Sequence, residues 1–168
     1  MKKFLILIIV LLLASSLYAE NGVTSNKDIK TIKVPIDGRA KIGVILGSPI
    51  GATFGYRFSN WFETNFIAGY DFCCSNAGMV GINGLFTLVN IGAGKAGVLP
   101  LSLGPQINFL FGGYKPFMMD ILADLRLEYT FRDIPLNLFG EFGAGIRLFD
   151  RNGVNFAFNS GLGIRYVF

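Results

Sequence analysis

The chain has 168 residues, of which 52% are hydrophobic and 15% charged, with a formal net charge of +4 at pH 7 and no histidine. This length suits one domain. The lack of histidine excludes Ser-His-Asp and Cys-His catalytic arrangements and His-ligated metals, and it removes the commonest general base. We therefore expect a non-enzymatic protein with no cofactor. Two of the positive charges, Lys2 and Lys3, lie at the extreme N-terminus, so the basic balance gives no support for a nucleic-acid partner.

The N-terminus has the pattern of an export signal. Lys2 and Lys3 precede an unbroken apolar run over residues 4–14, and Ala19 offers a small residue just before Glu20. This arrangement predicts a secretory signal peptide over residues 1–19, cleaved after Ala19. A membrane anchor is the alternative, but the run is shorter than the roughly 20 apolar residues that a spanning helix needs. No cysteine follows the run, which disfavours a lipoprotein.

Residues 20–39 are polar and charged, and we expect them to form a short, poorly ordered arm. From residue 40 to residue 168 apolar residues recur at every second position, which is typical of strands with two different faces. No later stretch is apolar enough over the length of a transmembrane helix. The alternation predicts eight strands, over residues 41–47, 52–58, 61–72, 79–91, 98–111, 119–131, 136–149 and 154–168.

The connections between these segments are short. Ser59-Asn60 and Asn152-Gly153 are two-residue hairpin signals, and we expect bulges at Pro100 and Pro105 because proline cannot donate to a strand ladder. Most segments reach the roughly 9–11 residues that cross a bilayer at a tilt. Eight is also the smallest usual strand number for a membrane barrel, and an even number places both ends on one side, which we expect to be the periplasm.

The two faces of the predicted strands differ sharply. One face is apolar and rich in Phe and Tyr, and the other carries all the charges of the strands, five positive and five negative. An eight-stranded interior holds only its own side chains or one small ligand, so the bulky apolar faces are expected to meet lipid and the charges to pair inside. The predicted lumen charge network comprises Lys41, Arg57, Glu63, Asp71, Asp124, Arg126, Glu128, Glu141, Arg147 and Arg165.

This segregation predicts an all-β fold, an eight-stranded antiparallel up-and-down transmembrane β-barrel over residues 40–168. Aromatic residues near the turns fit the girdles found at membrane interfaces. The clustered aromatics are Tyr56, Phe58, Trp61, Tyr70, Phe72, Tyr129, Phe131, Tyr166 and Phe168. A lumen filled by paired charges disfavours a wide channel, since porins need about 16 strands to leave an aqueous hole.

The last strand ends the chain on an apolar alternation of Leu162, Ile164, Tyr166 and Phe168. A soluble domain rarely ends on a bare apolar strand, because its edge would pair with other chains. This ending resembles the C-terminal signature of bacterial outer-membrane β-barrels, which implies that the barrel-assembly machinery reads these four residues. We therefore expect export to the outer membrane, with outer-membrane lipid as the surrounding partner.

Residues 41–51 (KIGVILGSPIG) followed by Tyr56, residues 135–138 (PLNL) and residues 161–168 (GLGIRYVF) together carry a family resemblance. Residues 40–168 are similar to the small spirochaete outer-membrane β-barrel family, a domain of unknown function. The resemblance implies an eight-stranded outer-membrane barrel with no established enzymatic activity. It does not carry over any role in binding host molecules.

Function is less determined than fold. We expect a structural or surface-interaction role, with the 112–118 connection as the candidate contact site for an unknown surface ligand through Tyr114, Lys115 and Phe117. The alternatives are a small selective pore and a secreted soluble barrel that binds a lipophilic ligand. The adjacent Cys73 and Cys74 are expected to be small residues at a loop edge, with a strained or intermolecular disulfide as the alternative.

A lipid-modifying enzyme is a fourth alternative. Asp124 and Glu128 are separated by Arg126, and Glu141 lies on the next predicted strand. Two carboxylates can serve as an acid/base pair. We instead interpret these residues as part of the ion-pair network.

Overall fold

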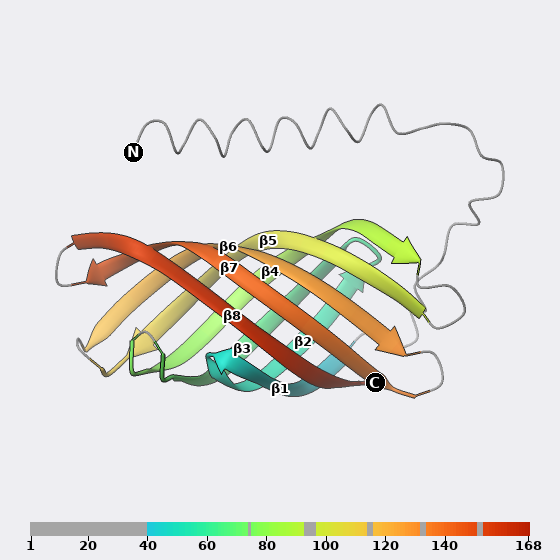
Figure 1. Ribbon diagram of the computed structural model, residues 1–168, viewed down its shortest axis with the longest axis horizontal. Helices are drawn as coiled ribbons and strands as arrows, with labels where there is room; N and C mark the ends of the chain where they lie inside the picture. The colour runs from blue at the N-terminus through green and yellow to red at the C-terminus, as the bar shows by residue number, and fades with distance from the viewer. Residues whose placement is uncertain (1–39, 74, 93–96, 114–115, 132–133, 151–152) are drawn as a thin grey trace, which may run out of the picture. The chain divides into compact units, whose positions relative to one another are not determined.

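The computed structural model describes residues 40–73, 75–92, 97–113, 116–131, 134–150 and 153–168 (Figure 1). The predicted signal peptide and arm lie outside these residues. The described chain forms eight β-strands and no helix. The strands are β1 (Ala40–Ser48), β2 (Ile50–Ser59), β3 (Phe62–Asp71), β4 (Ala77–Gly92), β5 (Gly97–Phe111), β6 (Phe117–Phe131), β7 (Leu136–Asp150) and β8 (Gly153–Val167).

Each strand pairs antiparallel with its neighbour in sequence, and β8 pairs with β1, so the sheet closes into a barrel. The predicted all-β, eight-stranded antiparallel fold is therefore confirmed. Closure removes the sheet edges that would otherwise expose unpaired backbone groups. At the seam, Ile42 pairs with Tyr166, and the backbone N–H of Phe168 donates to the carbonyl oxygen of Ala40 at 2.9 Å.

The strands are staggered around the ring. Starting at Ile42, successive partners are Phe54, Phe66, Ile82, Ile107, Ile121, Ile146 and Phe156. Across the seam, however, Ile42 pairs with Tyr166, which lies ten residues beyond Phe156 on β8. Such a stagger accompanies a strand tilt of about 35–45° to the barrel axis, and Figure 1 shows the strands crossing the barrel obliquely.

The barrel has two ends, which differ in what they carry. We call the end where β1 begins and β8 finishes the N/C end; the β2–β3, β4–β5 and β6–β7 connections also lie there. The opposite end, called the far end, carries the other four connections. Along a tilted strand, a residue's distance from either end depends on both its sequence position and this stagger.

The structure modifies some local predictions. β2 begins at Ile50, so the predicted 48–51 turn reduces to the region of Pro49, whose preceding peptide bond is cis. The bulge predicted at Pro100 is not there, since Pro100 pairs with Asn90 in regular register; the shift lies between Thr87 and Val89 of β4, opposite Ser102 and Leu101. Pro105 sits in continuous register with Ala123, so the bulge predicted there is wrong. Proline lacks a backbone N–H, but the side chains of β5 keep alternating between the two faces on either side of Pro105. No extra residue is therefore inserted there.

Apolar side chains cover the outer wall of the barrel. Leu162 is 72% exposed and Phe156 is 73% exposed, although both lie within regular strand. Every charged side chain in the described strands is instead buried or half-buried. In the described part of the chain, no helix has the length and hydrophobicity to cross a membrane.

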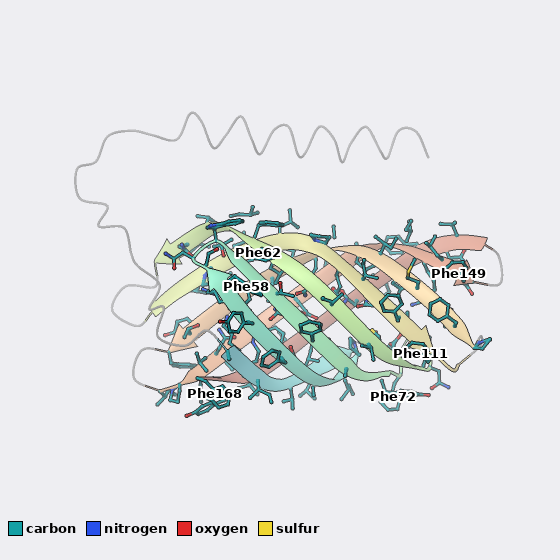
Figure 2. The ribbon with its side chains drawn as sticks, turned by 180° about the vertical axis from the view of Figure 1, so that it is seen from behind. Phe58, Phe62, Phe72, Phe111, Phe149 and Phe168 are labelled. Carbon is teal, nitrogen blue, oxygen red and sulfur yellow. The ribbon has the colours of Figure 1, made fainter. Side chains whose placement is uncertain are left out.

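Aromatic side chains gather on the outer wall near both ends. Figure 2 shows Phe58, Phe62 and Phe168 at one end and Phe72, Phe111 and Phe149 at the other. Ring contacts join Trp61 to Phe86 and Tyr166 to Phe168 at the N/C end, with centroids 5.9 and 4.9 Å apart. At the far end, Phe117 contacts Phe111, Phe149 and Phe109. These contacts form two aromatic bands, separated along the wall by aliphatic residues and single Phe side chains.

The lumen is less polar than the sequence suggested. Charged and amide side chains share it with a cluster of buried apolar side chains. That cluster comprises Ile45, Ile67, Ala77, Met79, Leu110, Met118 and Phe139. These residues stand an even number of positions from the buried charged or amide residues of their strands, so they face the lumen as those residues do. They fill space that only Gly, Asn and charged side chains were expected to occupy. The described interior is therefore a packed core rather than a hydrated tube.

Candidate functional site in the barrel lumen

The densest group of charges lies in the lumen toward the N/C end. Glu63 of β3 and Glu128 of β6 are both held by Lys41 of β1, whose Nζ lies 2.5 Å from Glu63 Oε2 and 2.7 Å from Glu128 Oε2. Arg57 contacts the same two carboxylates at 2.9 and 3.4 Å. Arg165 of β8 reaches Glu128 Oε1 at 2.5 Å and Glu63 Oε1 at 3.3 Å. Three cations thus surround two anions and connect five strands across the lumen.

A second group surrounds Arg126 and lies beside the first. Its Nη2 donates to Glu141 Oε2 at 2.5 Å and lies 3.9 Å from Asp124 Oδ2. The guanidinium groups of Arg126 and Arg165 both lie over the Phe139 ring, 4.9 and 4.4 Å from its centroid. A buried aromatic face contributes favourable cation–π interaction to desolvated guanidinium groups. Phe139 is therefore a functional member of the network that the strand pattern did not reveal.

Amide side chains extend the network beyond these charges in two chains. In the first chain Arg165 Nη1 donates to Asn65 Oδ1 at 2.6 Å, Asn65 donates to Asn83 at 3.0 Å, and Asn83 donates to Asp124 Oδ2 at 2.8 Å. In the second, Asn159 donates to Gln106 at 3.0 Å, and Gln106 donates to Asn108 at 2.9 Å. These five amides are essentially inaccessible, so their hydrogen bonds offset much of the cost of burial.

The far end of the lumen holds a separate ion pair. Arg147 of β7 donates to both carboxylate oxygens of Asp120 on β6, at 2.7 and 2.9 Å, in a bidentate pair. Asp120 is 3% exposed, and the predicted network omitted it. Its parity along β6 matches that of Asp124, Arg126 and Glu128, and this signal would have found it.

Asp71 also organises the chain at the far end of the lumen. Its Oδ1 accepts from the Ser48 hydroxyl at 2.5 Å and from the Cys73 N–H at 3.2 Å. Its Oδ2 accepts from the backbone N–H of Ser75 at 3.0 Å and from the Ser75 hydroxyl. Asp71 therefore anchors the β3–β4 connection and the end of β1 through hydrogen bonds.

With Asp120 included, the network has five positive and six negative side chains; Asp150, at the end of β7, is half-buried and accepts a hydrogen bond from Asn155. The structure brings eight of the ten predicted network residues into two adjoining groups, one toward the N/C end and one in the middle of the lumen, and places Arg147 and Asp71 at the far end. Buried charges are costly unless they are paired and hydrogen-bonded. The pairing across opposite walls indicates that these side chains close the lumen by contacting each other. Asp124, Glu128 and Glu141 are parts of this closure, each within 3.9 Å of Arg126.

The residues of the expected assembly signal all lie on the outer wall. Leu162, Ile164, Tyr166 and Phe168 are exposed, and they form an apolar ridge along β8 to the end of the chain. Of the expected surface contacts, Phe117 is 38% exposed at the start of β6. Tyr114 and Lys115 lie outside the described residues, as does Cys74, while Cys73 is an exposed free thiol.

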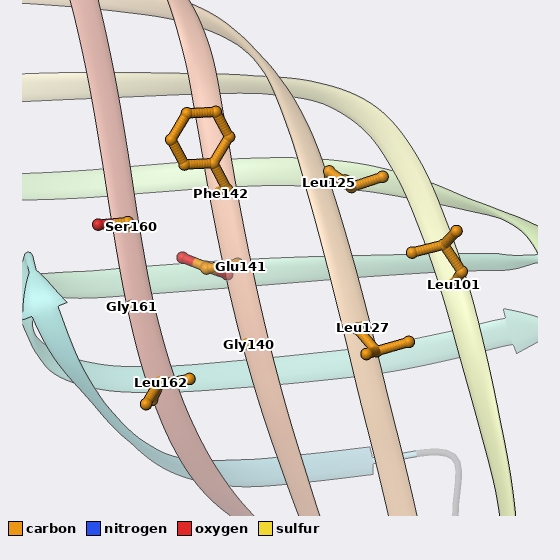
Figure 3. Close-up of a pocket in the computed structure, with 9 residues that line it drawn as sticks. All are labelled: Leu101, Leu125, Leu127, Gly140, Glu141, Phe142, Ser160, Gly161 and Leu162. Atoms are coloured by element: carbon orange, nitrogen blue, oxygen red, sulfur yellow. The ribbon is translucent and has the colours of Figure 1, made fainter. Parts of the chain in front are cut away.

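Shallow depressions occur on the outer wall. One lies over β5–β8, where Gly140 and Ser160 are small residues between Leu125, Leu127 and Leu162 (Figure 3). A neighbouring depression shares Leu127, Gly140 and Leu162 with it. Both are open and apolar, and they arise because small residues interrupt a wall of large side chains.

Comparisons with protein-family models, with curated proteins and with solved structures give no match to this chain. Among the described side chains, no group of three or more His, Cys, Asp or Glu residues is placed to hold a metal ion. The arrangement of this barrel therefore has to be interpreted from its own residues.

Proposed function

We propose that this chain is a non-enzymatic integral outer-membrane β-barrel with a structural or surface-interaction role. The observation that carries the proposal is the inversion of polarity. The outer wall of the described strands is apolar, and every charged side chain turns away from it. A wall this apolar is unfavourable in water over so large an area, whereas lipid is a matching solvent for it.

Two further features support a membrane position. The aromatic bands near the two ends correspond to the girdles that anchor barrels at the two interfaces. Closure of β8 onto β1 satisfies the backbone groups at the only seam, as hydrocarbon demands of any spanning sheet. We also propose that the chain is cleaved after Ala19 and belongs to the small spirochaete outer-membrane β-barrel family. The barrel-assembly machinery would recognise its C-terminal residues Leu162, Ile164, Tyr166 and Phe168.

The membrane position is tested by fractionating cells that express the full chain. The proposal expects the protein in the outer-membrane pellet after an alkaline wash, released by detergent, with a mature mass that begins at Glu20. It also expects the folded protein to migrate faster than the boiled protein in a gel. Recovery from the periplasmic or secreted fraction without detergent would instead support a soluble barrel that carries a lipophilic ligand.

A small selective pore is the second candidate, because buried polar side chains occur at the N/C end, in the middle and, with Arg147 and Asp120, at the far end of the lumen. The pairs Lys41–Glu128 and Arg126–Glu141, at 2.7 and 2.5 Å, argue for closure. Planar-bilayer recording of the refolded protein separates the two functions. The proposal expects no stable unitary currents, and reproducible currents would establish the pore.

A further inference from the structure

Three buried oxygens in the middle of the lumen have no hydrogen-bond partner. They are Oδ1 of Asp124, Oε1 of Glu141 and Oδ1 of Asn159, and their residues are 0%, 6% and 4% exposed. All three are acceptors when the carboxylates are ionised. A buried acceptor without a donor is costly, so their shared location needs an explanation.

The backbone brings these oxygens around one glycine. Gly143 of β7 pairs with Asp124 on one side and with Asn159 on the other. A Cβ at Gly143 would lie 2.1 Å from Asn159 Oδ1, so this amide oxygen leans over β7. Glu141 lies two residues along β7 on the same face. Its Oε2 shares Arg126 Nη2 with Asp124 Oδ2, which draws the two carboxylates together.

Two amide donors of this region are already used. Asn83 donates to the other oxygen of Asp124, and the amide nitrogen of Asn159 is used by Gln106. The nitrogens of Arg126 that make no hydrogen bond belong to a guanidinium stacked on Phe139, and its Nη1 faces Glu128 at 3.9 Å. The three oxygens therefore belong to residues that adjoin Gly143, and none of them receives a hydrogen bond from a described side chain.

Charge decides what kind of group fits there. Asp124 and Glu141 share the single guanidinium of Arg126, so one negative charge stays uncompensated locally, whereas Glu63 and Glu128 have three cations between them. We propose that a monovalent hard cation, of which sodium is the probe, binds over Gly143 between Asp124, Glu141 and Asn159. Carboxylate and amide oxygens are the ligands that hard cations prefer. A divalent ion would leave an excess positive charge beside Arg126.

The test needs only the folded barrel, in detergent or in buffer, so it is independent of the membrane position. The full mature chain is refolded in sodium chloride or in choline chloride at equal ionic strength, and its urea unfolding is followed. One-site linkage expects the unfolding equilibrium constant to fall about tenfold when sodium reaches about ten times its dissociation constant. Choline, whose quaternary ammonium cannot be coordinated directly by these buried oxygens, should have no such effect.

Three variants locate the effect. Gly143→Ala places a Cβ 2.1 Å from Asn159 Oδ1, which displaces this ligand, and should abolish the sodium dependence. Gly81→Ala is the matched control, because its Cβ would lie 2.3 Å from Asn108 Oδ1, an oxygen that already accepts from Gln106; it should keep the dependence. Asp124→Asn removes one charge and adds a donor, so it should also abolish the sodium effect, and it decides the matter if Gly143→Ala does not fold.

Equal stability of the wild type in the two salts would overturn the proposal. Stability that depends on pH but not on the cation would also overturn it, and would assign a shared proton to Asp124 and Glu141. Loss of the sodium effect in Gly81→Ala to the same extent as in Gly143→Ala would show that the effect does not come from the residues around Gly143.

Discussion

Glu128 is the side chain whose charge the lumen network depends on most. Lys41, Arg57 and Arg165 all contact its carboxylate, at 2.7, 3.4 and 2.5 Å, and Arg126 lies 3.9 Å away. Glu128→Gln keeps the shape but leaves three buried cations facing Glu63 alone. Removing one partner of a buried ion pair costs about 3–5 kcal/mol. We therefore expect the unfolding equilibrium constant to rise by more than about a hundredfold.

The assay is equilibrium urea unfolding of the refolded protein in detergent or lipid vesicles. Trp61 is the single tryptophan, it is 60% exposed on the outer wall, and its fluorescence reports folding together with gel migration. Asp120→Asn is the matched control: Asp120 pairs with Arg147, which is half-buried, whereas Glu128 is surrounded by four cations, so we expect a smaller loss than in Glu128→Gln.

A second substitution examines the cause of the loss. Lys41→Met removes one of the three cations that Glu128→Gln leaves without a partner. The double variant should therefore recover part of the stability lost in Glu128→Gln, with a coupling energy of about 1 kcal/mol or more. The reasoning is refuted if Glu128→Gln unfolds within about 1 kcal/mol of the wild type. It is also refuted if Glu128→Gln and Asp120→Asn are equally destabilised.

The remaining predictions concern the wall and its assembly. Deleting Phe168 should lower the outer-membrane level of the protein far more than Phe109→Ala does, and equal levels on an immunoblot would show that the ending is not an assembly signal. Leu125→Arg, at the middle of β6, should destabilise the barrel in vesicles by about 2–4 kcal/mol, against about 0–1 kcal/mol for Val154→Arg near the far end; equal losses would argue against a bilayer around the wall. Gly163→Val should cost about 1–3 kcal/mol in urea unfolding, because a Cβ there would lie 2.2 Å from the Phe139 ring, whereas Gly78→Ala, whose Cβ would have its nearest contact at 3.6 Å, should be nearly neutral.

The number of strands, and the face on which each side chain lies, could be predicted from the sequence. Both follow from the recurrence of apolar residues at every second position. The alternation along β6 places Asp124, Arg126 and Glu128 on one face and Leu125 and Leu127 on the other, as the structure has them. Parity says which face a residue takes, and it is a local property of the chain.

Partners inside the lumen could not be predicted in the same way. Lys41 and Glu128 are 87 residues apart and meet because the ring is staggered by ten residues. The stagger sets the distance of each side chain from the barrel ends, and it follows from hydrogen-bond register, which the alternation does not specify. Phe139 illustrates the limit: its inward parity was readable, but its position between Arg126 and Arg165 depends on that register.

The central claim, that the apolar wall faces lipid, is tested most directly by tryptophan quenching across β7. In a Trp61→Phe background, Phe142→Trp places the probe on the outer wall and Phe139→Trp places it in the lumen, three residues away. In vesicles of brominated lipid, the account predicts strong quenching of Phe142→Trp and weak quenching of Phe139→Trp. Equal quenching of the two probes, or strong quenching of Phe139→Trp alone, would contradict it.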